Sequence, residues 1–525
     1  MISAAAAKAL GALFRIPLTN MLGGVGMSYF SCAYSIFMPV YALTVTGLSA
    51  AIARVTARCA ALGLYRNALR VRRTALVLFS AAGLAGSFIV ALFAESFSVW
   101  STGSRDAAPA SVMIAPAVFF GCAAAVYRGY YEGLSNMYPT AFSQAAEGIV
   151  KVTAGLSLCS YVMHNEERFR ELFPYITDTR ALAAAAGISG VTLSTAGAAV
   201  FLAVMGISDR RGHISTGEKM LSFREISSEL IRTALPAGVC AVVTNLTALI
   251  DMRTLIGGIE FDAVNCPEGI SPAEYPQFMY GSFSGIALTV FNLVPSVTNM
   301  LGRGVIPCVT EAWAGSRKDL LRSRTMQALF TAAVLSVPAA AGMAAAAPEL
   351  LGTLFPGQSD EAAVCIAPLR YLMPGMVCLC LTYPVSGMLQ GVGRPAVPLY
   401  ITLGGTAVKL IGNLLLIPQA GMNGAAISTS VSYMLMLAVS VVWYLSVTGI
   451  SLSVKPFISV GYSAALCGGG AYLAADIVME RTGEALPSLA AAAVAGASLY
   501  FAALMISGGR MIVSWIKKKP AQRQA

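Results

Sequence analysis

Charged residues are scarce in this chain. Lys, Arg, Asp and Glu together make up 11% of its 525 residues, whereas hydrophobic residues make up 57%. Soluble domains contain roughly 25% charged residues, and a soluble protein of this length needs a far more polar surface. The composition therefore excludes a cytosolic enzyme, a nucleic-acid-binding protein and a disordered chain, and it indicates an integral membrane protein with many spans.

Residue patterns for metal or covalent chemistry are also missing. Most of the 11 cysteines stand in apolar runs, where free cysteine behaves as a small hydrophobe, and no CxxC pair has zinc spacing. The two histidines, His164 and His213, are expected on opposite sides of the membrane. No nucleophile triad or phosphate-binding glycine loop is found, so we expect no metal, no cofactor and no enzymatic activity.

Long apolar runs are what the chain has in abundance. A bilayer-spanning helix needs about 20 predominantly apolar residues. By that criterion the sequence predicts fourteen transmembrane helices, at about 2–22, 28–52, 74–98, 111–129, 138–163, 181–206, 233–257, 279–301, 325–347, 365–389, 396–417, 422–446, 456–478 and 486–509.

The distribution of basic residues gives the expected orientation. With the N-terminus inside, 22 Lys and Arg residues, Arg128 among them, fall in cytoplasmic segments and five fall outside. Basic residues are enriched in cytoplasmic loops of membrane proteins. We therefore expect a multi-pass protein of the bacterial cell membrane with both termini in the cytoplasm.

An internal repeat divides the chain. Residues 128–156 (RGYYEGLSNMYPTAFSQAAEGIVKVTAGL) align with residues 386–414 (SGMLQGVGRPAVPLYITLGGTAVKLIGNL) at an offset of 258, and a weaker echo pairs Gly47 with Gly302. The repeat predicts two six-helix lobes in parallel orientation, which is typical of transporters with a central cavity. The predicted domains are lobes at 1–206 and 233–446, a cytoplasmic inter-lobe loop at 207–232, and two further helices with a basic tail at 447–525.

Seven bases and two acids in or beside the predicted spans are candidates for function, because an ionisable group in the bilayer costs about 2.5–3.5 kcal/mol. Lys8, Arg303 and Arg370 lie near predicted helix ends, where long side chains also reach the interface. The excess of bases predicts a positively charged cavity that attracts an anion, and Arg and Lys suit a diphosphate. The predicted substrate-binding residues are Arg15, Lys151, Arg253, Lys409 and Arg303.

The acids Glu147 and Asp251 are the candidates for coupling to Na⁺ or H⁺. Glu147 precedes Lys151 by four residues, a spacing that predicts an ion pair on one helix face. In the second repeat Gly405 stands where the first has Glu147, so Lys409 lacks such a partner. Asp251 and Arg253 are two positions apart and are expected to point in different directions.

Several segments resemble a known transporter family. LGALFRIPLTNMLGGVGMSYFSCAYSIF, TVTGLSAAIARVTAR and YRGYYEGLSNMYPTAFSQAAEGIVKV are similar to the polysaccharide-exporter branch of the MOP flippase superfamily, especially the stage V sporulation protein B type, which is related to the MurJ-type lipid II flippases. LVPSVTNMLGRGVIPCVTEAWA, GMLQGVGRPAVPLYITLGGTAVKLIGNLLLIP and GMNGAAIST extend the resemblance over roughly residues 5–445.

This resemblance implies a MATE-like, all-α fold of fourteen helices with a cavity open alternately to each side. It implies transfer of undecaprenyl-diphosphate-linked sugars to the outer leaflet for cell-wall, spore-cortex or other polysaccharide synthesis. Arg15 matches a basic residue of the flippases' first helix, although Ile16 replaces the acid that often follows it. The last two helices match a pair that forms a lipid-tail groove. The expected partners are the lipid-linked anionic glycan and membrane lipids, with no nucleic acid, and we expect a monomer.

Two other functions remain open on the sequence alone. A cation-coupled multidrug antiporter of the same fold would need membrane-embedded carboxylates, and the predicted spans contain only Glu147 and Asp251. A membrane enzyme acting on lipid-linked sugars would need acid–base residues in a large outer loop. The largest such loop, 257–278, has acids but no His, Arg or Lys, so the flippase hypothesis is preferred.

Overall fold

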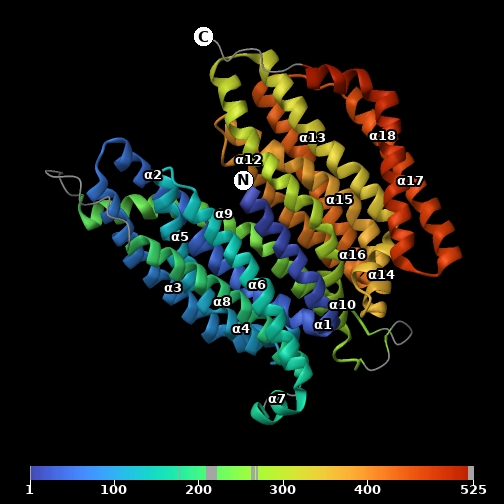
Figure 1. Ribbon diagram of the computed structural model, residues 1–525, viewed down its shortest axis with the longest axis horizontal. Coiled ribbons are helices and arrows are strands. Elements are labelled where there is room, and N and C mark those ends of the chain that lie inside the picture. Colours follow the sequence, from blue (N-terminus) through green and yellow to red (C-terminus); the bar gives the residue numbers. More distant parts are fainter. Residues whose placement is uncertain are drawn as a thin grey trace. The chain divides into compact units, whose positions relative to one another are not determined.

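The computed structural model describes residues 2–174, 176, 178–207, 221–261, 266–267 and 270–517. These residues are nearly all helical, and no strand occurs among them. The chain divides into two compact units, Met1–Gly285 and Ile286–Ala525, each of which is a bundle of long helices (Figure 1). The all-α class predicted from the sequence is confirmed.

The first unit contains the helices up to the start of the second half of the chain. They are α1 (Ile2–Tyr41), the π-helix η1 (Ala42–Thr46), α2 (Leu48–Ala61), α3 (Tyr65–Thr102), α4 (Ala108–Ile114), α5 (Pro116–Gly133), α6 (Tyr138–His164), α7 (Glu166–Leu172), α8 (Thr179–Ile207), α9 (Phe223–Gly258) and α10 (Tyr275–Ser282). A second π-helix, η3 (Phe283–Ala287), follows α10 directly.

The second unit contains the remaining helices. They are α11 (Leu288–Phe291), α12 (Leu293–Ala314), α13 (Lys318–Ala345), α14 (Ala347–Leu354), α15 (Ser359–Gly391), α16 (Val397–Thr448), α17 (Lys455–Thr482) and α18 (Ala485–Lys517). The sequence-based lobe boundaries describe the repeat, not these compact units, and they stay a prediction.

Two of the longest helices are hairpins. In α16, Ser428 donates a hydrogen bond to the carbonyl of Lys409, and Ser432 donates one to the carbonyl of Gly405, across separations of 19 and 27 residues. A straight helix would hold these pairs roughly 28 and 40 Å apart. Gly421, at φ +53°, is where the chain reverses.

The same reversal occurs in α1 at Gly23, whose φ is +66°. The rings of Phe14 and Phe30 lie 6.2 Å apart on the two arms, although a straight helix would separate these residues by about 24 Å. Glycine serves both turns because it adopts positive φ without a Cβ clash.

All fourteen predicted spans fall on helical segments, and both reversals fall between predicted spans. By length and hydropathy, nine helices of the described residues qualify as membrane spans, or ten with the bent pair Tyr275–Phe291 and Leu293–Ala314. Two of the nine are the runs of 48 and 52 residues that contain the hairpins. The multi-span architecture is established, and the number fourteen stays a prediction.

Large apolar side chains cover the outside of the helices, as a bilayer requires. On α3, Leu84, Phe88 and Leu92 are 56%, 67% and 60% exposed and recur every four residues along one face. The opposite face packs inward through small residues, including Gly83 and Gly86. Such a continuous apolar face is stable in lipid, whereas a soluble protein exposes few patches of this size.

The internal repeat is visible in the backbone turns. Between α5 and α6, the amides of Leu134, Ser135 and Asn136 donate to the carbonyls of Tyr130, Glu132 and Tyr131. Between α15 and α16, the three corresponding bonds occur 258 positions later, from Val392, Gly393 and Arg394. Each donor and each acceptor of the first turn thus has a counterpart in the second. Ser135 and Gly393, the middle donors of the two turns, both have positive φ.

A second pair of matching turns lies at an offset of 253. Leu62, Gly63 and Leu64 close the α2–α3 connection with the same three bonds that Gly315, Ser316 and Arg317 make between α12 and α13. At this offset Ser49, not Gly47, corresponds to Gly302. The helix packing agrees, because Gly129 lies against Ser49 and Gly387 lies against Gly302. The weaker echo in the sequence was therefore two residues out of register.

Candidate functional site: buried bases in each unit

Arg15 lies on the first arm of α1 and contacts the π-helix that follows α10. Its Nη1 donates to the Ser284 carbonyl at 3.4 Å, and Thr19, one turn later, donates to the carbonyls of Arg15 and Gly285 at 2.8 and 3.3 Å. A π-turn shifts the ordinary i, i+4 hydrogen bonds and is frequent at functional sites. Here the π-helix supplies carbonyl oxygens that hold α1 and orient Arg15.

Lys151 lies beside the same stretch of α1. Its Nζ is 5.2 Å from the centre of the Phe14 ring and 5.5 Å from that of Tyr34. Phe14 directly precedes Arg15, so the arm of α1 that carries Arg15 also carries one of the two rings under Lys151. A lysine placed over aromatic faces is attracted by the ring quadrupoles and keeps its ammonium donors for another partner.

The rings under Lys151 belong to an aromatic row on the second arm of α1. Phe30, Tyr34, Phe37 and Tyr41 follow one another with ring centres 5.0, 6.1 and 4.9 Å apart. The spacing of three or four residues places them on one helix face. This row fixes the position of Lys151 without neutralising its charge.

Glu147 forms its ion pair with Arg128, not with Lys151. Its Oε2 lies 2.7 Å from Nη2 of Arg128, and its Oε1 accepts a bond from Thr195 at 3.5 Å. Arg128 is also held by Ser143, whose Oγ is 3.1 Å from Nε. The predicted ion pair of Glu147 with Lys151 is therefore wrong, because the carboxylate of Glu147 binds Arg128 of α5 instead.

Arg128 belongs to this arrangement, although the sequence predicted it only as one of the cytoplasmic bases. It lies within α5, and its side chain is only 15% exposed; its cytoplasmic placement stays a prediction. The signal for a role in the site was its position near the end of a predicted span, at the start of the segment 128–156 that repeats at 386–414. With Glu147 neutralised by Arg128, the charge of Lys151 stays uncompensated by that acid.

Asp251 and Arg253 do point in different directions, as predicted. Asp251 is buried, at 4% exposure, and lies within electrostatic range of the Tyr280 hydroxyl, which is itself hydrogen-bonded to Ser35. Arg253 is exposed and stacks over Trp100 of α3 at 5.6 Å. The two residues therefore belong to different sites within the first unit.

Lys409 is buried in the second unit, at 5% exposure, on the first arm of α16. The neighbouring Gly405 lies directly against Met436. A carboxylate at that position would collide with Met436, so the packing explains why the second repeat has no equivalent of Glu147. Arg303 belongs to α12, but its side chain lies outside the residues that the structure describes.

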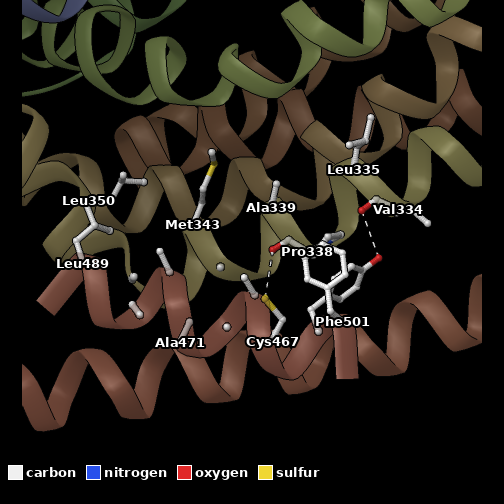
Figure 2. Close-up of a pocket in the computed structure, with 17 residues that line it drawn as sticks. Val334, Leu335, Pro338, Ala339, Met343, Leu350, Cys467, Ala471, Leu489 and Phe501 are labelled. Carbon is white, nitrogen blue, oxygen red and sulfur yellow. Dashed lines mark hydrogen bonds between the residues drawn. The ribbon is translucent and has the colours of Figure 1, made fainter. Parts of the chain in front are cut away.

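An apolar pocket lies among α13, α14, α17 and α18, within the second unit. Figure 2 shows its lining, which includes Leu335, Met343, Leu489 and Phe501. Its volume is about 550 Å³. The resemblance to flippases implied a lipid-tail groove at the last two helices, and the pocket lies on those helices.

Two hydrogen bonds connect side chains of the pocket lining to the backbone of α13. Tyr500 donates to the carbonyl of Val334 at 3.3 Å, and Cys467 donates to that of Pro338 at 3.9 Å. Both side chains thus direct their polar atoms to the α13 backbone (Figure 2). The remaining side chains of the lining are apolar, which suits a hydrocarbon chain and not a charged group.

No group of three or more metal-ligating side chains occurs among the described residues. The arrangement instead combines arginine and lysine cations, aromatic faces and backbone carbonyls in helices that cross a membrane. Arginine and lysine cations of this kind are suited to an anion.

Comparison with known proteins places this arrangement in a family. The polysaccharide biosynthesis protein family matches residues 1–313, which is more than half of the chain, and the MatE family matches residues 283–415. The chain is 22% identical over 502 residues to stage V sporulation protein B of Bacillus subtilis (strain 168), covering 95% of this chain and 92% of that protein. It is 21% identical over 454 residues to the lipid II flippase MurJ of the same organism, covering 81% and 77%.

The fold is likewise similar to a solved structure. The lipid II flippase MurJ in its inward closed conformation matches with a TM-score of 0.69 at 13% identity, covering 97% of this chain and 99% of that chain. At this identity the likeness concerns the fold, which confirms the expected MATE- and MurJ-like architecture. The fold is also similar to that of a multidrug resistance MATE family transporter of the MOP superfamily, with a TM-score of 0.66 at 16% identity, covering 84% of this chain and 94% of that chain. The chain belongs to the polysaccharide biosynthesis protein family.

Proposed function

We propose that this protein is a flippase that moves an undecaprenyl-diphosphate-linked glycan from the inner to the outer leaflet of the bacterial cell membrane. The observation that carries the proposal is the base Lys151, which lies over the rings of Phe14 and Tyr34 and has no ion pair among the residues that the structure describes. Phe14 directly precedes Arg15 on α1. Diphosphate oxygens are the natural partners of Arg and Lys cations in a setting of low dielectric constant. An organic cation would be repelled there.

The two units contribute bases from equivalent positions of the repeat. Lys151 on α6 corresponds to Lys409 on α16, and the turns that precede both helices have the same hydrogen bonds. In the proposed mechanism Arg15 and Lys151 are the diphosphate-binding bases of the first unit and Lys409 is that of the second. Most of the lipid tail stays in the bilayer, and the apolar pocket on α17 and α18 takes part of it.

Release on the outer side requires the site to weaken. Glu147 and Asp251 are the acids available for coupling to Na⁺ or H⁺, and the membrane potential is a further source of energy. Arg128 already binds Glu147, so we propose Asp251, buried beside Tyr280 and Ser35, as the first residue to test for ion coupling. The chain acts as a monomer and without enzymatic chemistry in this proposal.

The proposal is tested in proteoliposomes that contain a fluorescent undecaprenyl-diphosphate-linked sugar. The double variant Arg15→Ala with Lys409→Ala should abolish transfer to the opposite leaflet while the protein still elutes as a folded species. The matched control is Arg105→Ala with Arg481→Ala, which also removes two positive charges, both from exposed positions. This control should leave transfer unchanged. Wild-type transfer by the Arg15 and Lys409 variant would refute the site.

The remaining alternative is a multidrug antiporter, which is supported by the match of residues 283–415 to the MatE family. Native mass spectrometry of the purified protein with the lipid-linked precursor and with a hydrophobic cation dye separates the two. Retention of the diphosphate lipid, lost in Arg15→Ala, supports the flippase. Binding of the dye alone would support the antiporter and would make Asp251 and Glu147 the residues of interest.

A further inference from the structure

A further pocket, which belongs to the first unit, lies at the end of α3, close to the start of α10. Its volume is about 450 Å³, within the size range of small-ligand sites. It is lined by Trp100 and Gly103 at the end of α3, by Arg253 and Ile256 on α9, and by Gln277 on α10, among others. Arg253 is one of the predicted substrate-binding residues, but the pocket that it lines has been given no role so far.

The pocket contains a cation on an aromatic face. The Arg253 guanidinium lies 5.6 Å from the centre of the Trp100 ring, and both side chains are exposed. No ion pair of Arg253 with another described residue is present in the structure. A stacked guanidinium keeps its edge donors available for a planar, bidentate anion such as a carboxylate.

An amide fixes the inner side of the pocket. Gln277 is 5% exposed, and its Nε2 donates to the Thr102 carbonyl at 2.8 Å. Its carboxamide oxygen is buried and has no hydrogen-bond partner in the part of the chain that the structure describes. Buried acceptors are almost always satisfied in folded proteins, so a water or a bound molecule is needed to supply a donor to this oxygen.

These three groups together fit a sugar that bears a carboxylate. The apolar face of a pyranose ring would pack on the face of Trp100 that Arg253 does not cover, its carboxylate would pair with the guanidinium, and a hydroxyl or acetamido N–H would donate to the Gln277 oxygen. A neutral sugar would leave Arg253 without its anion. A bare diphosphate would make no use of the ring or the amide.

The pocket is also at a suitable distance from Arg15. Gln277 and Ser284, the contact of Arg15, are seven positions apart on one helical segment, which corresponds to about 10 Å. A diphosphate held near Arg15 therefore places an attached short oligosaccharide within reach of the pocket.

We propose that the Trp100–Arg253–Gln277 pocket is a glycan subsite selective for a sugar that carries a carboxylate. The inference rests on the proposed flippase function, and it adds the chemical class of the head group. It assigns Arg253 to recognition of the sugar and removes it from the set of bases that hold the diphosphate.

The test uses purified full-length protein in detergent and three probes that share one lipid. They are undecaprenyl diphosphate alone, undecaprenyl-diphosphate-N-acetylglucosamine and undecaprenyl-diphosphate-N-acetylmuramic acid, which differ in the presence of a sugar and of its carboxylate. We expect wild type to bind the acidic probe at least tenfold more tightly than the neutral one. Arg253→Gln should remove that preference and leave the affinity for undecaprenyl diphosphate unchanged.

Two further variants define the site. Trp100→Ala should weaken both sugar-bearing probes and spare the bare diphosphate lipid. Arg105→Gln is the matched control, because Arg105 is near the same end of α3 but is exposed and paired with Glu95, and it should change none of the three affinities.

The outcomes separate this inference from the proposed function. Equal binding of all three probes by wild type would overturn the subsite and leave the flippase proposal intact. Loss of bare undecaprenyl diphosphate in Arg253→Gln would show that the pocket binds the diphosphate, which also overturns the subsite. If wild type binds none of the lipids, the flippase proposal fails. The subsite is then tested by itself with soluble N-acetylmuramic acid. Binding is followed by the quenching of tryptophan fluorescence in wild type, and Trp100→Phe, which lacks the reporting side chain, is the control. No quenching there would overturn it.

Discussion

Glu147 and Arg128 form an ion pair of 2.7 Å between α6 and α5, and their side chains are 23% and 15% exposed. The pair joins two helices on either side of a tight turn. It also decides the charge of the site, because the carboxylate that stands one turn from Lys151 is already satisfied.

Removing one member of this pair should destabilise the protein. In Glu147→Gln, Arg128 keeps Ser143 but loses its carboxylate, and we expect the free energy of unfolding to fall by about 1.5–3 kcal/mol, the range for hydrogen bonds to charged groups. Thermal unfolding in detergent measures the change. Arg128→Gln combined with Glu147→Gln should cost less than the two single changes added together; strictly additive losses would show that the two residues do not interact.

Lys151 should be required for transport but not for folding. In Lys151→Met the side chain still packs on Phe14 and Tyr34 but carries no charge, so we expect at least tenfold slower transfer in proteoliposomes with an unchanged melting temperature. Lys151→Arg restores a cation over the same rings and should retain most of the activity. Full transfer by Lys151→Met would remove this residue from the site.

Arg180 connects the start of α8 with α10 and the second arm of α1. It lies 2.7 Å from Glu274, just before α10, and 2.9 Å from Asp178, which accepts a bond from Tyr29 at 3.1 Å. In Arg180→Gln both carboxylates lose their cation, so we expect faster amide hydrogen exchange in the first turn of α10. Glu274→Gln should have a smaller effect, because Arg180 still holds Asp178.

The control for that measurement is Arg105→Gln. Its ion pair with Glu95 is between side chains that are 80% and 61% exposed, and exposed pairs contribute about 0–1 kcal/mol. Exchange in α10 should therefore not change. Unaltered exchange in Arg180→Gln as well would mean that the network does not hold the start of α10.

The fold was predictable because its determinants are local. Apolar runs and the offset of 258 between Lys151 and Lys409 are properties of continuous sequence, and the structure shows helices and matching turns at those places. The two spans predicted at 396–417 and 422–446 fall on the two arms of α16, on either side of the reversal at Gly421.

The partners in the site were less predictable than its members. The spacing of Glu147 and Lys151 favoured a pair on one helix, but the tertiary neighbour Arg128 binds the carboxylate more directly. The π-helix that presents the Ser284 carbonyl to Arg15, and the stacking of Arg253 on Trp100, join residues that are far apart in the chain. A single sequence carries no signal for such contacts.

The hairpin at Gly421 gives a test of the membrane topology. Gly421 has φ +53°, and a left-handed conformation costs a residue with a Cβ about 1–2 kcal/mol. Gly421→Ala should therefore lower the melting temperature in detergent. Gly404→Ala, in the same helix, is the matched control: Gly404 has no heavy atom within 4 Å of the added Cβ and a helical φ, so alanine there should be neutral or stabilise by about 0.5–1 kcal/mol. An equal melting temperature for the two variants would mean that the chain does not reverse at Gly421, and the two predicted spans on α16 would then have to be merged.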